Sequence, residues 1–283
     1  MGYEIIEAVP LIGALGAEIR GLDLAKPIDD ATFAEIERAF LEYQAICFRG
    51  QKLTPDDQLA FAARFGEIDT YPFVQPLEGY EGIVPIVKEP ETRINFGGGW
   101  HTDTSYMPQP PKATLLYGVD IPERGGDTMF SNTYAAYDDL SDGLKQLLEG
   151  RTAVFTASAV HGARGAYSHV KAGDVKRRQD ESQAELRVEH PVFRTHPDTG
   201  RKAIYVGRFH VERLSGMRVD ESAPLLSFLT SHAVKPEYTM RFQWEPGTVL
   251  IWDNRCVQHN ALNDYPGQRR EVHRVTIKGD TPF

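Results

Sequence analysis

The chain of 283 residues has few cysteines and no long apolar run. Its two cysteines, Cys47 and Cys256, provide no disulfide framework, and two free thiols suit a reducing cytosol. No apolar run approaches the length that spans a bilayer, and the first residues lack the charged region and apolar core of a signal peptide. Ile6 also breaks the myristoylation pattern. We therefore expect a cytoplasmic protein that has no membrane partner.

Positive residues are outnumbered by negative ones: 31 lysines and arginines stand against 40 aspartates and glutamates, which gives a formal net charge of −9 at pH 7. An acidic chain lacks the broad basic surface that attracts nucleic acids, so we expect no nucleic-acid partner. A local basic pocket is still compatible with this balance. Hydrophobic residues make up 41% of the chain, which is enough to bury a full core. We expect residues 1–283 to form a single domain that assembles as a homo-oligomer.

The chain does contain many short strand-like runs, separated by turns rich in glycine and proline. The predicted strands are Gly16–Leu24, Ala45–Phe48, Ala113–Val119, Asp127–Phe130, Pro191–Arg194, Lys202–Val206, Tyr238–Trp244 and Val249–Trp252. The last four are expected to pair as two hairpins. Helices are fewer, and their expected N-caps are Asp29 or Asp30, Thr54, Ser141 and Asp220. Without βαβ alternation or an internal repeat, this pattern favours a mainly β fold with peripheral helices, a jelly-roll-like barrel.

One segment does not fit that order. Residues 161–189 are charged and have no apolar period, so we expect a mobile insertion there. A substrate lid and a solvated surface loop are equally consistent with its composition.

A potential metal site lies at His101-Thr102-Asp103. On an extended strand, side chains two residues apart point to the same side, so this imidazole and carboxylate could bind one metal ion. Alone the pattern is weak, because a pair of this kind on a surface strand arises often by chance. Support comes from His259, which follows a strand ending in Trp-Asp-Asn. Two histidines and one carboxylate form the face that holds a non-haem Fe(II) and leaves positions open.

Two residues that could bind a cosubstrate come after these ligands in the chain, one after Asp103 and one after His259. Fe(II) with three protein ligands can accept a bidentate 2-oxo acid and still bind O2. A dicarboxylate cosubstrate needs a cation for its far carboxylate, which an arginine supplies in a planar, bidentate manner, and a threonine hydroxyl can add a hydrogen bond. Thr128 and Arg270 are the candidates for these two roles.

Taken together, the motifs resemble the taurine/2,4-dichlorophenoxyacetate dioxygenase (TauD/TfdA) family of Fe(II)- and 2-oxoglutarate-dependent oxygenases. The resemblance covers almost the entire chain. Its motifs are Gly16–Leu24, Gln44–Arg49, Trp100–Asp103, Gly125–Thr128, Ala135–Ser141, Thr195–Gly200, Trp252–Arg255, Gln258-His259, Asp264-Tyr265, Gln268–Arg270 and His273-Arg274.

The resemblance implies a double-stranded β-helix, which is a cupin-like jelly roll. It implies Fe(II) binding by His101, Asp103 and His259, and 2-oxoglutarate anchoring by Thr128 and Arg270. The expected reaction uses O2 to hydroxylate a small organic anion, with release of succinate and CO2. Candidate substrates are a sulfonate, a sulfate ester, a phosphonate or a carboxylate.

The residues expected at the primary substrate depart from those of taurine dioxygenase. Arg274 matches the position that holds the substrate's anionic group in sulfonate-oxidising members. Tyr71 could substitute for a substrate-binding histidine, Asn95 could reach the position of an asparagine, and His210 could line the pocket. Because Gly97 stands near the expected asparagine, taurine itself is a doubtful substrate.

The same residues also bear on reactions other than hydroxylation. Asp103 argues against halogenation, because halogenating relatives have a small residue in place of the carboxylate. Desaturation stays open. Further alternatives are a cupin-like, metal-dependent isomerase or hydrolase and a non-catalytic jelly-roll binding protein, although Thr128 and Arg270 count against the isomerase or hydrolase.

Overall fold

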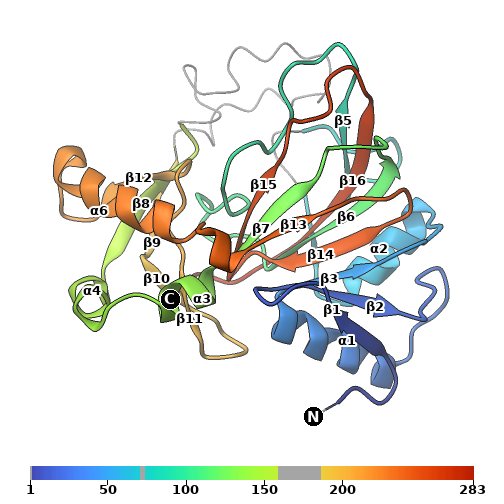
Figure 1. Cartoon of the computed structure of the whole chain (residues 1–283), viewed down its shortest axis with the longest axis horizontal. Helices are drawn as coiled ribbons and strands as arrows, with labels where there is room; N and C mark the ends of the chain where they lie inside the picture. The colour runs from blue at the N-terminus through green and yellow to red at the C-terminus, as the bar shows by residue number, and fades with distance from the viewer. Residues whose placement is uncertain (1, 71–73, 159–185) are drawn as a thin grey trace.

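A computed structural model describes residues 2–70, 74–158 and 186–283, and β-sheet is its main component (Figure 1). The largest sheet contains, in spatial order, β1 (Glu7–Pro10), β2 (Ala17–Arg20), β3 (Ala45–Phe48), β14 (Val249–Asp253), β6 (Ala113–Asp120), β16 (Arg270–Ile277) and β4 (Ile68–Asp69). Strand β5 (Ile83–Lys88) also pairs with β16. A second sheet has the order β13 (Thr239–Phe242), β7 (Thr128–Asn132) and β15 (Val257–Ala261).

These two sheets pack face to face through a shared hydrophobic core. Phe130 of β7 and Trp252 of β14 lie with ring centroids 5.3 Å apart. Leu116 of β6, Met240 of β13 and Val272 of β16 belong to the same buried cluster. The sheets are antiparallel except for the parallel pair β2 and β3, and two facing sheets that bury their inner side chains form the sandwich of a jelly roll. The predicted mainly β, double-stranded β-helix fold is therefore confirmed.

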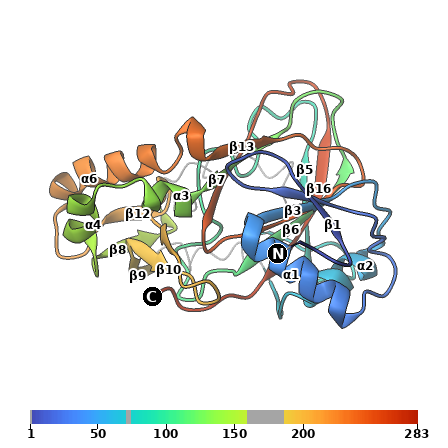
Figure 2. The ribbon, with the colours of Figure 1, turned by 60° about the horizontal axis from the view of Figure 1, so that its bottom comes forward.

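Two N-terminal helices, α1 (Asp30–Tyr43) and α2 (Pro55–Ala63), cover the outer face of the large sheet (Figure 2). The side chain of Asp29 accepts a hydrogen bond from the backbone N–H of Thr32, which confirms one of the two predicted caps. Thr54 begins α2 with a capping box. The helices thus close one side of the barrel and leave its interior to the two sheets.

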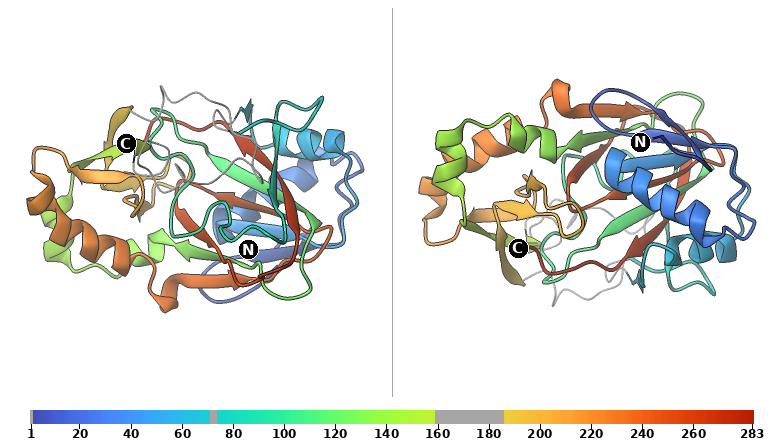
Figure 3. Two further views of the ribbon diagram at one scale, coloured as in Figure 1. Left: turned by 90° about the horizontal axis from the view of Figure 1, so that it is seen from above. Right: turned by 90° about the horizontal axis from the view of Figure 1, so that it is seen from below.

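A third group of elements forms a separate layer beside the barrel (Figure 3). It contains α3 (Thr133–Asp138), α4 (Asp142–Leu148), β8 (Thr152–Thr156), β9 (Arg187–Pro191), β10 (Phe193–Thr195), β11 (Lys202–Ile204), β12 (Val211–Leu214), α6 (Val219–His232) and the 3₁₀ turn η2 (Pro236–Tyr238). Strands β12, β8 and β9 form a small sheet, and β10 pairs with β11 as the predicted hairpin. Ser141 caps α4 as predicted.

The hairpin predicted between Tyr238–Trp244 and Val249–Trp252 is wrong. Strand β13 pairs with β7, whereas β14 pairs with β3 and β6, so the turn at residues 245–248 crosses from one sheet to the other. The backbone of Gly247 holds this crossing, because its N–H donates to Gly118 and its carbonyl accepts from Gln51. All five residues of β14 are buried, which suits a central strand covered on both faces.

Two predicted boundaries also differ from the structure. The N-cap of α6 is Arg218, and Asp220 lies in the first turn; the Glu221 carboxylate accepts the Arg218 N–H from the N3 position. The predicted insertion at 161–189 extends too far, because Arg187–Pro191 forms β9 and pairs with β8. The rest of that insertion, up to residue 185, lies outside the described residues. None of the described helices is long and apolar enough to cross a membrane.

Candidate active site

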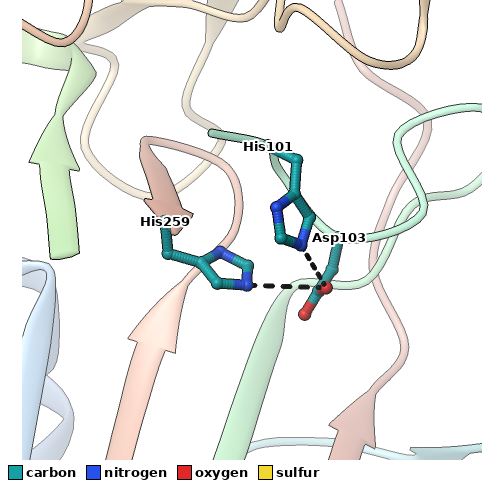
Figure 4. A group of neighbouring side chains, drawn as sticks. All are labelled: His101, Asp103 and His259. Carbon is teal, nitrogen blue, oxygen red and sulfur yellow. Dashed lines mark ion pairs between the residues drawn. The ribbon is translucent and has the colours of Figure 1, made fainter. Parts of the chain in front are cut away.

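Three side chains from two distant segments of the chain point towards one another (Figure 4). Nε2 of His101 and Nε2 of His259 each lie 3.7 Å from Oδ1 of Asp103. The three ligand atoms lie within 4.8 Å of one another. His259 belongs to β15, and the other two residues precede β6. The structure therefore brings together the three residues that the sequence motifs predicted as metal ligands.

The local conformation of the first motif differs from the extended strand that the sequence predicted. His101 forms a single β-bridge with His259, in which each backbone N–H donates to the carbonyl of the other residue. The chain then turns at Asp103, and Thr104 has a φ of 39°. The expected strand is therefore reduced to a single bridge at His101, and a turn begins at Asp103.

Gly99 orients the imidazole of His101. Its carbonyl oxygen lies 2.8 Å from Nδ1 of His101, and a carbonyl can only accept, so Nδ1 carries the proton. In the neutral tautomer that this bond selects, Nε2 carries the lone pair, on the side of the ring that faces Asp103. Gly99 is held in turn by its own N–H, which donates to Oδ1 of Asn260 at 2.6 Å. Outer hydrogen bonds of this kind set the tautomer and direction of metal-binding histidines.

Replacement of Gly99 by alanine is expected to weaken metal binding by about tenfold, the lower end of what outer partners of a ligand contribute. Its φ is +91°, and a Cβ there would lie 2.2 Å from Cε2 of Phe209, so the loop that orients His101 must shift. Gly267→Ala is the matched control, because φ is +71° there but the added Cβ meets no atom within 4 Å. Metal titration of both variants tests this expectation, and equal affinities would contradict it.

The electrostatics of the cluster favour a cation. Burial first, and then the neighbouring His101 and Arg274, lower the pKa of His259 to about 3 against the opposing charge of Asp103, so this imidazole is neutral at neutral pH and offers a lone pair. For Asp103, burial alone would raise the pKa, but the charge of Arg274 and the two imidazoles together lower it below its ordinary value. Two imidazoles and one carboxylate are the donor set that Fe(II) accepts.

The three residues of the cluster line a cavity of about 50 Å³. Both predicted cosubstrate residues, Thr128 and Arg270, line the same cavity. Trp244 connects them: its indole N–H donates to Oγ1 of Thr128 at 3.0 Å, and its ring lies 5.6 Å from the Arg270 guanidinium. Since the indole fills an acceptor position of Thr128, the hydroxyl hydrogen is available for another partner.

Arg270 is buried, and its Nε has no hydrogen-bond partner among the described residues. Burial lowers its pKa, but a guanidinium stays protonated in proteins. A buried cation with an unsatisfied donor beside a potential Fe(II) site fits the far carboxylate of a 2-oxo dicarboxylate. The residues present therefore fit both the metal and the cosubstrate that the sequence predicted.

Arg274 lies four residues further along β16, on the same face as Arg270. It is 4% exposed, and its Nη2 lies 3.2 Å from Oδ2 of Asp103. The remaining cavity wall is largely apolar and includes Ile86, Phe96, Leu116, Trp252, Ala261 and Val272. Arg274 thus places a cation beside the metal cluster, in a cavity that apolar side chains also line.

The other predicted substrate residues have different surroundings. The amide of Asn95 donates to the carbonyl of Ala261, so it holds the end of β15 and is absent from the cavity wall. His210 is buried, with Nδ1 2.9 Å from the Ser105 hydroxyl and its ring 6.4 Å from that of His101. Tyr71 lies outside the described residues. A substrate role for each of these three residues stays a prediction.

Several residues near the motifs have structural roles, as the sequence indicated. Arg269 pairs with surface carboxylates of Glu89, Asp120 and Glu271. His273 contacts Gln58 on the outer side of β16. Burial raises the pKa of the Cys256 thiol well above its ordinary value, which leaves it protonated and unreactive.

Comparisons with known proteins agree with this site. The sequence model of the family described as taurine catabolism dioxygenase TauD, TfdA family matches residues 7–276. An alkylsulfatase from Acinetobacter baylyi is 38% identical over 95% of this chain and 84% of its own. An alpha-ketoglutarate-dependent sulfate ester dioxygenase from Pseudomonas putida is 36% identical over 98% of this chain and 91% of its own. The crystal structure of a taurine dioxygenase from Burkholderia xenovorans superimposes with a TM-score of 0.83 at 34% identity, covering 99% of this chain and 93% of that one.

The chain therefore belongs to the TauD/TfdA family, and the resemblance drawn from its motifs is confirmed. It is an oxidoreductase of the dioxygenase class, which uses Fe(II), 2-oxoglutarate and O2 and acts on small organic anions. The isomerase, hydrolase and binding-protein alternatives are set aside.

Proposed function

We propose that the primary substrate is an alkyl sulfate ester, and that the side chains described above carry out its oxidation. The observation that carries the proposal is the buried Arg274, which contacts Asp103 and lines the same cavity as the metal cluster and several apolar side chains. A planar guanidinium can donate two hydrogen bonds to two oxygens of the tetrahedral sulfate group. The apolar side chains suit the carbon next to the ester oxygen, and the rest of an alkyl chain would extend beyond this cavity of about 50 Å³. The two sulfate-ester relatives support the same substrate class.

Each group of the site has a distinct role in this proposal. His101, Asp103 and His259 hold the metal, which, when bound with 2-oxoglutarate and O2, supplies the oxidant for the C–H bond. Arg270 and the hydroxyl of Thr128 bind the far carboxylate of 2-oxoglutarate. Arg274 holds the sulfate and thereby brings the adjacent carbon towards the metal.

The products follow from the position of oxidation. Hydroxylation of the carbon that bears the ester oxygen gives a species that breaks its C–O bond to sulfate. An aldehyde and sulfate are released, while 2-oxoglutarate becomes succinate and CO2. One O2 supplies one oxygen atom to the substrate carbon and one to succinate, so atoms and electrons balance without a further reductant.

Taurine suits this cavity less well. Its ammonium group needs an acceptor, and among the described residues of the cavity wall the only carboxylate is Asp103, which the metal requires. A buried charge without a partner costs several kcal/mol. We therefore expect kcat/KM for taurine to be at least about 100-fold below that for a medium-chain alkyl sulfate.

The measurement is formation of succinate, sulfate and aldehyde by the Fe(II)-loaded protein with ascorbate, O2 and each candidate. Arg274→Gln is expected to raise KM for the alkyl sulfate more than it changes 2-oxoglutarate binding, because its role is with the substrate. A screen in which taurine or an aryloxy acid outperforms every alkyl sulfate would refute the proposed substrate.

A further inference from the structure

The two carboxylate oxygens of Asp103 have different surroundings. Oδ1 faces both imidazoles, at 3.7 Å from each Nε2. Oδ2 faces the other way, where it accepts a hydrogen bond from the Thr114 hydroxyl at 2.6 Å and lies 3.2 Å from Nη2 of Arg274. Only one oxygen of the carboxylate is therefore turned towards the position that a metal would take.

A chain of buried hydrogen bonds fixes this orientation. The indole N–H of Trp252 donates to Oδ1 of Asn254 at 3.0 Å, and Nδ2 of Asn254 donates to Oγ1 of Thr114 at 2.9 Å. An indole N–H can only donate, so the oxygen of the Asn254 amide must face it and the NH₂ must face Thr114. The Thr114 hydroxyl accepts that bond, and its own hydrogen is therefore given to Asp103.

The sheet provides the frame for these contacts. Thr114 on β6 lies directly opposite Trp252 on β14, so the two side chains share one face. The backbone N–H of Asn254 donates to the carbonyl of Lys112, which anchors the residue after β14. Thr114, Trp252 and Asn254 are at most 1% exposed, so water does not compete for these bonds.

We propose that Thr114, oriented by Asn254 and Trp252, is a positioning residue that keeps Asp103 bound to the metal through one oxygen. A six-coordinate ion with three protein donors has three positions left, which a bidentate 2-oxo acid and O2 fill. A carboxylate that turned to bind through both oxygens would occupy one of these. Arg274 also contacts Oδ2, but under the proposed function its guanidinium is shared with the substrate's sulfate, whereas the Thr114 hydroxyl donates its hydrogen to Oδ2 alone. The inference rests on the proposed assignment of Asp103 as a metal ligand.

The test compares Thr114→Val, which removes the hydroxyl at nearly constant volume, with Thr114→Ser, which retains it. Binding of Mn(II), and then of 2-oxoglutarate to the Mn(II)-loaded protein, is measured by calorimetry without any primary substrate. We expect Thr114→Val to weaken metal binding by about tenfold and to weaken 2-oxoglutarate binding further, and Thr114→Ser to restore both to within about twofold of the wild type. The absorption band of the anaerobic Fe(II)–2-oxoglutarate complex should shift in Thr114→Val and stay at its wild-type position in Thr114→Ser.

Trp252→Phe provides a second variant in case Thr114→Val fails to fold. It keeps every group that touches Asp103 but releases the Asn254 amide, so a smaller loss in the same direction is expected. Thermal unfolding of the metal-free proteins distinguishes positioning from a general loss of stability. Wild-type affinities and an unshifted band in both Thr114→Val and Trp252→Phe would overturn the inference. Because no primary substrate enters this experiment, failure of alkyl sulfates as substrates leaves its result unaffected.

Discussion

His101→Ala is expected to abolish metal-dependent turnover and to weaken metal binding by more than about 100-fold, since loss of a ligand exceeds the loss of an outer partner. The variant removes one of three donors and leaves the buried carboxylate of Asp103 with His259 and Arg274 as its charged or ionisable neighbours. The backbone bridge between positions 101 and 259 does not involve the side chain, so the fold should persist.

The measurement is titration of the metal-free protein with Mn(II) or Fe(II) under anaerobic conditions, together with its thermal unfolding. His273→Ala is the matched control, because that imidazole lies on the outer side of β16 and contacts Gln58 and Glu271. Wild-type metal affinity in His101→Ala would mean that the metal assignment is wrong. A similar loss in both variants would point to a non-specific effect of removing a histidine.

The second large effect is expected from Arg270→Met, which should weaken 2-oxoglutarate binding by about 100-fold, corresponding to about 3 kcal/mol for a buried charged partner. Methionine preserves much of the packing against Trp244, but it supplies no donor to the far carboxylate. Metal affinity without cosubstrate should change little, since the described contacts of Arg270 do not include the three ligands. A loss of 2-oxoglutarate affinity without a loss of metal affinity distinguishes a residue that anchors the cosubstrate from one that only supports the site.

Arg269→Met is the control for the second prediction. It removes the same charge one residue earlier, where the guanidinium pairs with surface carboxylates and is 37% exposed at the side chain. Exposed pairs of this kind contribute about 0–1 kcal/mol, so cosubstrate affinity should stay near that of the wild type. Unchanged 2-oxoglutarate affinity in Arg270→Met would remove Arg270 from the proposed role.

The sequence predicted the donors of the site better than their local structure. His101, Asp103 and His259 were recognised by residue type and order, yet the expected strand at the first motif is a bridge followed by a turn. Spacing within a motif limits which side chains can meet, but it does not specify the path of the backbone between them.

The roles of the residues that support the ligands were not visible in the sequence. Thr114 and Trp244 are ordinary residues, and nothing in their spacing points to a metal or a dicarboxylate. Asn254 stands in a family motif, but the motif does not reveal its contacts. Their roles depend on contacts across sheets, such as the bond between Asn254 and Thr114, which are 140 positions apart. The fully buried Thr114 could have been noticed only as a polar residue in an apolar strand, since such groups require a partner.

Residue types and their order were sufficient for the mainly β fold, the family and the iron- and 2-oxoglutarate-dependent chemistry, because each depends on short patterns that local physics can interpret. The pairing of β13 and β14 with different sheets, and the single oxygen that Asp103 turns towards His101 and His259, became visible only in three dimensions. Both depend on the register of strands that are far apart in the chain. Register is selected by the packing of the whole core, and no local pattern contains that information.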